Sequence, residues 1–181
     1  MASDFTFDLG NTVLTAYAVP GHTVGSMVLL DPKTGDLYTS DSLGSNDPIG
    51  PNSGLLDDVG IECSLDRYYT ALVDLRKKVN GRAKRIFTGH NPLPLDMKYL
   101  DNVIATVKNA LDKGESALVP SIRPPESTYG STTMFAYGDY RVDPNSVAIN
   151  PKYLYAKDAE ANPPKIIKGY LNPQARAYPK Q

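Results

Sequence analysis

Residues 19–26, Val-Pro-Gly-His-Thr-Val-Gly-Ser, constrain the fold most, because they place a histidine in a proline and glycine turn between two strand-like runs. The run before the turn, residues 12–19, is rich in β-forming residues, and the run after it, residues 26–31, is continuously apolar. A histidine at the end of a strand can direct an imidazole nitrogen into a cleft, and small neighbours let a metal or a substrate come close. We therefore interpret His22 as a presented side chain.

Two later positions match this one. Asp41 closes a strand-like run at residues 37–41, and His90 follows the apolar run at residues 85–88. The chain has 2 histidines, and both are predicted at a junction between a strand and a loop, beside a glycine.

The motifs Pro-Gly-His-Thr-Val-Gly-Ser, Leu-Tyr-Thr-Ser-Asp-Ser-Leu-Gly and Thr-Gly-His-Asn, in this order, resemble those of the metallo-β-lactamase-fold hydrolases. The resemblance covers residues 5–114 and implies that His22 binds one metal, that Asp41 bridges two metals and that His90 binds the second. Ser40 departs from the pattern, since the family usually has glycine before the aspartate.

The family's earlier His-x-His-x-Asp-His motif, which supplies the remaining ligands, is absent from the sequence. The resemblance therefore implies an α+β fold of the αββα type, of which this chain is the C-terminal half. We expect a mostly antiparallel sheet covered by two helices, with an appended β-hairpin.

Hydrophobic periodicity predicts the individual elements. A hairpin is expected from residues 5–9 and 12–19, and the apolar run at 26–31 is typical of a strand buried on both faces. Residues 36–40 and 85–88 are predicted strands, and 42–60 an irregular loop beside the metal groove. A first helix should begin after Ser64 as N-cap, with Tyr68 in its apolar stripe. A second should run from about Asp96 to Lys113 with Gly114 as C-cap.

Composition shifts divide the rest of the chain. We predict residues 1–115 as the C-terminal half of the metallo-β-lactamase-like domain, 116–155 as a connector and appended hairpin, and 156–181 as an irregular arm. The hairpin strands are expected at residues 132–142 and 146–149, and the opening of a further domain is the alternative for this region.

Charge and composition exclude several classes of partner. A formal net charge of -1 gives no electrostatic basis for binding nucleic acid or an anionic membrane surface. No apolar run reaches the roughly 18 residues of a membrane span, and no signal segment begins the sequence. We expect a cytoplasmic protein, with secretion left open by the missing N-terminal half. The single cysteine, Cys63, is interpreted as a structural thiol.

Imidazole and carboxylate side chains are usual zinc ligands, and a catalytic zinc needs about three protein ligands and an open position for water. Zinc would lower the pKa of its water from 15.7 to about 7. With one histidine per ion and a shared Asp41, we expect one or two zinc ions in the complete protein and an inactive, metal-poor chain alone. The motif context is closest to the glyoxalase-II-like and lactonase-like group, which implies small ester, thioester or lactone substrates; Asn46, Asn52 and Asn91 are candidates to bind them.

The alternative function is a non-catalytic binding or dimerisation module derived from this fold. A missing half would leave an apolar sheet face uncovered, and such a face favours association. The predicted partner is then either the missing N-terminal half or a second copy of the chain.

Overall fold

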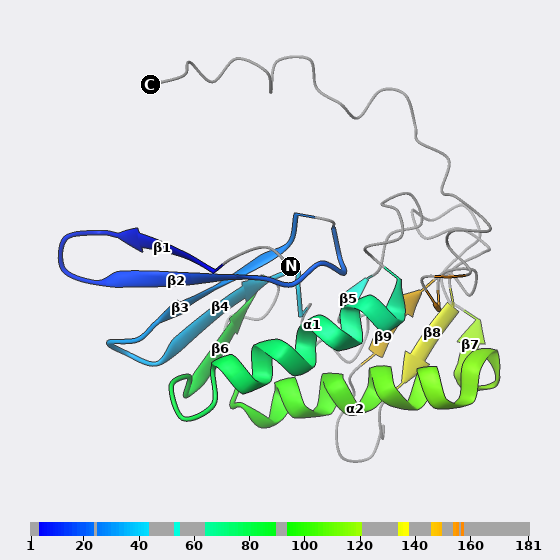
Figure 1. The fold of residues 1–181 in the computed structure, drawn as a ribbon. Helices are drawn as coiled ribbons and strands as arrows, with labels where there is room; N and C mark the ends of the chain where they lie inside the picture. Colours follow the sequence, from blue (N-terminus) through cyan, green and yellow to red (C-terminus); the bar gives the residue numbers. More distant parts are fainter. Residues whose placement is uncertain are drawn as a thin grey trace.

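A computed structural model describes residues 4–23, 25–43, 53–54, 64–89, 94–120, 134–137, 146–149, 154–155 and 157. These residues form two sheets and two α-helices that lie side by side along them (Figure 1). The larger sheet is five-stranded, in the order β1-β2-β3-β4-β6. Its strands are β1 Phe5–Asp8, β2 Val13–Ala18, β3 Met27–Asp31, β4 Asp36–Ser40 and β6 Arg85–Thr88.

Pairing in the larger sheet is antiparallel except between β4 and β6, which are parallel. The predicted hairpin is confirmed, because Phe7 of β1 pairs with Leu14 of β2. β6 is parallel to β4 because the first helix carries the chain back to the end of the sheet at which β4 begins. The mostly antiparallel sheet expected from the sequence is therefore present.

Both predicted helices are present and cover one face of this sheet. They are α1 Leu65–Lys78 and α2 Lys98–Lys113. Apolar residues recur along each helix at helical spacing, and they pack against alternate residues of the strands. The resulting core includes Val28, Leu30, Leu37 and Ile86 of the sheet with Leu65, Tyr68, Leu72, Leu75, Leu100, Val103 and Val107 of the helices.

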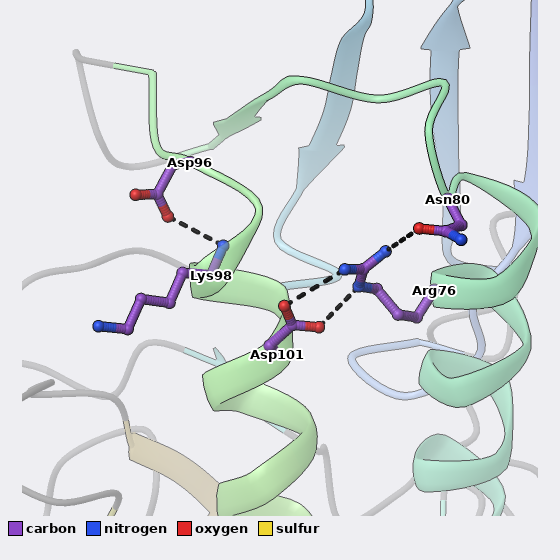
Figure 2. Close-up of polar contacts among 5 residues, drawn as sticks. All are labelled: Arg76, Asn80, Asp96, Lys98 and Asp101. Atoms are coloured by element: carbon purple, nitrogen blue, oxygen red, sulfur yellow. Dashed lines mark hydrogen bonds and ion pairs between the residues drawn. The ribbon is translucent and has the colours of Figure 1, made fainter.

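Polar contacts fix the ends and the outer sides of the helices (Figure 2). The Arg76 guanidinium of α1 donates to both carboxylate oxygens of Asp101 in α2, at 2.6 and 3.4 Å. Asp96 accepts a hydrogen bond from the Lys98 N–H, so α2 begins two residues later than the sequence predicted. Ser64 occupies the N-cap of α1, but its hydroxyl donates to the Asp66 carboxylate rather than capping a backbone N–H. Among the described residues no helix has the length and apolarity needed to cross a bilayer.

The opposite face of the sheet is apolar and exposed in the described chain. The prediction that residues 26–31 form a strand buried on both faces is wrong, because Val28 and Leu30 are buried whereas Met27 is 48% exposed. Both helices lie on the Val28 side, and nothing described covers the other side. The exposed large apolar residues on this face are Phe5, Phe7, Met27 and Tyr38.

The second sheet has the strand order β5-β9-β8-β7 and contacts the far end of α2 (Figure 1). Its strands are β5 Ser53–Gly54, β7 Leu118–Pro120, β8 Met134–Tyr137 and β9 Ser146–Ile149. The antiparallel pair β8-β9 confirms the appended hairpin, although β8 is shorter than predicted. The sequence did not predict β5 or β7, and most of the loop at 42–60 lies outside the described residues.

After the β8-β9 hairpin, the chain returns to the core that the larger sheet forms with α1 and α2. Leu154 is buried in that core, and its carbonyl accepts from the Asp66 N–H at 3.1 Å. The domain boundaries at 115 and 155 stay predictions, and the arm at 156–181 lies almost entirely outside the described residues, as does Cys63.

Candidate functional site

Strand direction brings the predicted ligands to one edge of the sheet. β2 and β4 are each antiparallel to β3, and β6 is parallel to β4, so β2, β4 and β6 all run the same way. The residues that follow their ends therefore emerge at the same edge. His22 follows β2, Asp41 follows β4, and Gly89 follows β6.

The turn that carries His22 is closed by its own hydrogen bonds. The Val19 N–H donates to the Ser26 carbonyl at 2.8 Å and closes the base of the turn. Thr23 donates its N–H to the Ser26 hydroxyl at 2.9 Å, and the Ser26 N–H donates to the Thr23 carbonyl at 3.2 Å. Threonine and serine are thus used as local backbone partners, which shapes the turn between β2 and β3.

Asp41 is directed by an irregularity at the end of β4. The register with β6 shifts between Tyr38, which pairs with Phe87, and Ser40, which pairs with Thr88. Such a bulge bends a strand and re-aims the residues that follow it. Ser40 also has φ +45°, in the left-handed region that favours glycine. This conformation explains why a glycine is expected before the aspartate, as in the family pattern.

Gly89 packs directly on Asp41. The Gly89 N–H donates to the Ser40 carbonyl at 3.2 Å, which extends the β4-β6 pairing to the edge. A Cβ at position 89 would lie 2.6 Å from Oδ1 of Asp41, so only glycine fits there without a shift. His90, the next residue, lies outside the described residues, and its predicted role stays a prediction.

His22 and Asp41 face each other across this edge. The imidazole Nε2 lies 3.9 Å from the carboxylate Oδ2, and the two side chains are 27% and 43% exposed. Two donors on one tetrahedral zinc, each at about 2.0–2.2 Å, are separated by roughly 3.4 Å. The donor types fit zinc, and the separation requires only a small closure. Within the described part of the chain, no three His, Cys, Asp or Glu side chains form a metal-binding group.

Asp36, at the start of β4, contrasts with Asp41 at its end. Arg85 donates two hydrogen bonds to the Asp36 carboxylate, at 2.7 and 2.9 Å. This paired guanidinium holds the pKa of Asp36 below its ordinary value, against the opposing effect of burial. Because Asp36 is buried and its charge is paired, we assign it to the stability of the sheet rather than to the site.

Sequence reasoning missed two tyrosines beside the site. Tyr68 was predicted only as part of the apolar stripe of the first helix, and Tyr99 was not singled out. In the structure, their hydroxyls donate to the carbonyls of Ser42 and Leu43, at 2.6 and 2.8 Å. The available signal was chemical, since a buried tyrosine hydroxyl requires a partner. The substrate candidates Asn46, Asn52 and Asn91 all lie outside the described residues.

No protein-family model matches the chain, and no curated protein matches it either. Similar solved structures include the metallo-β-lactamase from Pontibacter korlensis, at 22% identity and a TM-score of 0.42, over 60% of this chain and 47% of that chain. The DIM-1 metallo-β-lactamase is 17% identical with a TM-score of 0.43, over 58% and 46% of the two chains. The sec-alkylsulfatase Pisa1 from Pseudomonas sp. is 12% identical with a TM-score of 0.48, over 64% and 18%.

The chain thus spans less than half the length of these two lactamases. The observed architecture, a mostly antiparallel sheet with two helices on one face, is the one that the sequence predicted for part of a metallo-β-lactamase fold. The roles of His22, Asp41 and His90 stay predictions.

Proposed function

We propose that this chain is the C-terminal part of a zinc-dependent hydrolase of the metallo-β-lactamase superfamily, in which His22, Asp41 and His90 are metal ligands. One observation carries the proposal. The end of β4 and the turn after β2 bring a carboxylate and an imidazole to 3.9 Å at an accessible sheet edge. Zinc bound there supplies a water that ionises near neutral pH.

The position of Gly89 supports the assignment of His90. Gly89 contacts the Asp41 carboxylate and hydrogen-bonds to Ser40. Gly89 immediately precedes His90 in the sequence, and Gly89 lies at the edge where Asp41 does. The three side chains provide imidazole and carboxylate donors and still leave each of two ions short of the usual ligand number. The remaining ligands belong to a complementary half.

The exposed sheet face is the surface on which that half would pack. Met27 is 48% exposed and follows the His22 turn, and Tyr38 is 43% exposed and precedes Asp41 by three residues. A partner sheet covering these residues would end beside the metal site. The substrates we propose are small esters, thioesters or lactones, which accords with the motif context and with a net charge of -1 that does not favour nucleic acid.

Zinc binding tests the proposal directly. We expect the chain to bind zinc weakly, and His22→Ala, Asp41→Ala and His90→Ala each to weaken binding by tenfold or more, since each removes a ligand. Asp74→Ala, which removes a half-exposed carboxylate on α1 that pairs with Lys78, is the control and should leave affinity unchanged. Isothermal titration with elemental analysis measures both effects. Equal affinity in all five proteins would overturn the ligand assignment, and thioester hydrolysis by the chain alone would contradict its incompleteness.

A dimerisation module is the second candidate, and the exposed apolar face favours it. Phe5, Phe7 and Tyr38 are 57, 47 and 43% exposed on the face of the sheet that is opposite the helices. Contiguous apolar faces of this kind are uncommon on monomeric proteins. If two copies cover each other, light scattering should show a dimer that Phe7→Ser and Tyr38→Ser dissociate and that Lys33→Ser, in the β3-β4 turn, does not. A strict monomer would exclude this candidate.

A further inference from the structure

Tyr68 of α1 contacts the backbone just before His22. A Cβ at Gly21 would lie 2.3 Å from Cδ2 and 2.7 Å from Cε2 of the Tyr68 ring. The glycine therefore lies flat against the ring, and no larger residue fits without moving it. Both residues are buried, so the contact is part of the packed core under the turn.

The same side chain holds the backbone just after Asp41. The Tyr68 hydroxyl donates to the Ser42 carbonyl at 2.6 Å in a buried hydrogen bond. Tyr99 of α2 donates to the next carbonyl, that of Leu43, at 2.8 Å. Ser42 and Leu43 are themselves buried. One tyrosine from each helix thus holds the chain where it leaves β4.

His22 and Asp41 follow strands that are not neighbours, because β3 lies between β2 and β4. A rigid group that contacts both segments can fix their separation, and Tyr68 is such a group. We propose that Tyr68 is a positioning residue that sets the distance between the His22 imidazole and the Asp41 carboxylate. This inference rests on the proposed metal site. Tyr68 itself contacts neither the metal nor the substrate in this proposal.

The test uses tyrosine variants that differ only in the hydroxyl lost. Tyr68→Phe keeps the ring and removes the bond to Ser42. Tyr155→Phe is the matched control, because the Tyr155 hydroxyl donates to the Leu111 carbonyl at 2.6 Å, on α2. Mutation of residues that support metal ligands without binding the metal typically lowers metal affinity about 10- to 100-fold. We expect Tyr68→Phe to weaken zinc binding about tenfold, and Tyr155→Phe to leave it within about twofold of the original value.

Amide NMR spectra of the metal-free chain give a second readout. Tyr68→Phe should shift the amide signals of Gly21–Thr23 together with those of residues 41–43, although these segments are far apart in the sequence. Gly21→Ala should shift the same two segments, because its methyl group displaces the ring. It serves as the second variant if Tyr68→Phe does not fold. Tyr155→Phe should shift neither segment.

The outcomes separate this inference from the proposed function. If the unsubstituted chain binds no zinc while Tyr68→Phe still shifts both segments, the metal site is wrong and the coupling stands. If zinc binds and Tyr68→Phe weakens it no more than Tyr155→Phe does, the positioning role is wrong and the metal site stands. Amide shifts confined to one segment would likewise overturn the coupling.

Discussion

Replacing Ser40 by glycine should stabilise the protein. Ser40 has φ +45°, and its side chain is exposed, so the substitution removes backbone strain without removing packing. A left-handed conformation costs an L-residue roughly 1–2 kcal/mol. Glycine also makes the unfolded chain more flexible, which lowers stability by about 0.4–1 kcal/mol and offsets part of this gain. The net expectation is a gain of about 0.5–1 kcal/mol, which corresponds to a rise of about 1–4 °C in Tm for a chain of this size.

Gly81 offers the reverse experiment in the same protein. It has φ +70°, and a Cβ built there would meet no atom within 4 Å, so Gly81→Ala changes only the backbone energy. The same two contributions then act with opposite sign, and we expect a loss of about 0.5–1 kcal/mol. Ser40→Ala keeps the Cβ and removes only the hydroxyl, so its stability should stay close to that of the unsubstituted chain.

Urea unfolding followed by circular dichroism measures all three variants. The reasoning requires Ser40→Gly and Gly81→Ala to move the midpoint in opposite directions by similar amounts. If Gly81→Ala is destabilised as expected while Ser40→Gly is unchanged or less stable, Ser40 is not strained. The bulge at the end of β4 would then be fixed by its hydrogen bonds rather than held against a conformational cost.

Two further substitutions test the edge and the base of the sheet. Gly89→Ala places a Cβ 2.6 Å from Asp41 Oδ1 and should displace that carboxylate, which lowers zinc affinity by about tenfold or more on titration; unchanged affinity would show that Asp41 does not bind the metal in this position. Arg85→Met removes the guanidinium that lowers the pKa of Asp36. A depressed carboxyl pKa stabilises the protein above the unfolded pKa near 3.9, and this stability is lost as the pH falls through the folded pKa. The destabilisation by Arg85→Met should therefore be largest above about pH 4 and smaller when urea unfolding is measured at more acidic pH. A destabilisation that does not depend on pH would contradict this account.

Local pattern was enough to predict the elements that form the core. The apolar stripes of both helices and the alternation in the first strands follow directly from helical and β periodicity. Such signals depend only on which face of each element is buried. They therefore predicted α1, α2 and the hairpin, and they failed at β3. There the uninterrupted apolar run suggested burial on both faces, whereas the described chain covers only one.

The geometry of the site depended on information that local pattern does not contain. Strand order placed the ends of β2 and β4 at one edge, and the separation of His22 from Asp41 was inaccessible before that order was known. The strain at Ser40 was visible only as a departure from a family motif. The contacts of Tyr68 join positions 47 and 26 residues apart, and a residue in a helical apolar stripe is ordinarily interpreted as core.

The proposed site and the exposed apolar face lie next to each other. The edge that carries His22 and Asp41 borders the apolar face through Met27 and Tyr38, so whatever covers that face also encloses the edge. Enclosure lowers the local dielectric and strengthens the attraction between a carboxylate and a cation. A complementary half would therefore bring ligands and raise the affinity of those already present. By the same linkage, zinc should tighten the association of the two halves, because a ligand that binds only the assembled state stabilises it.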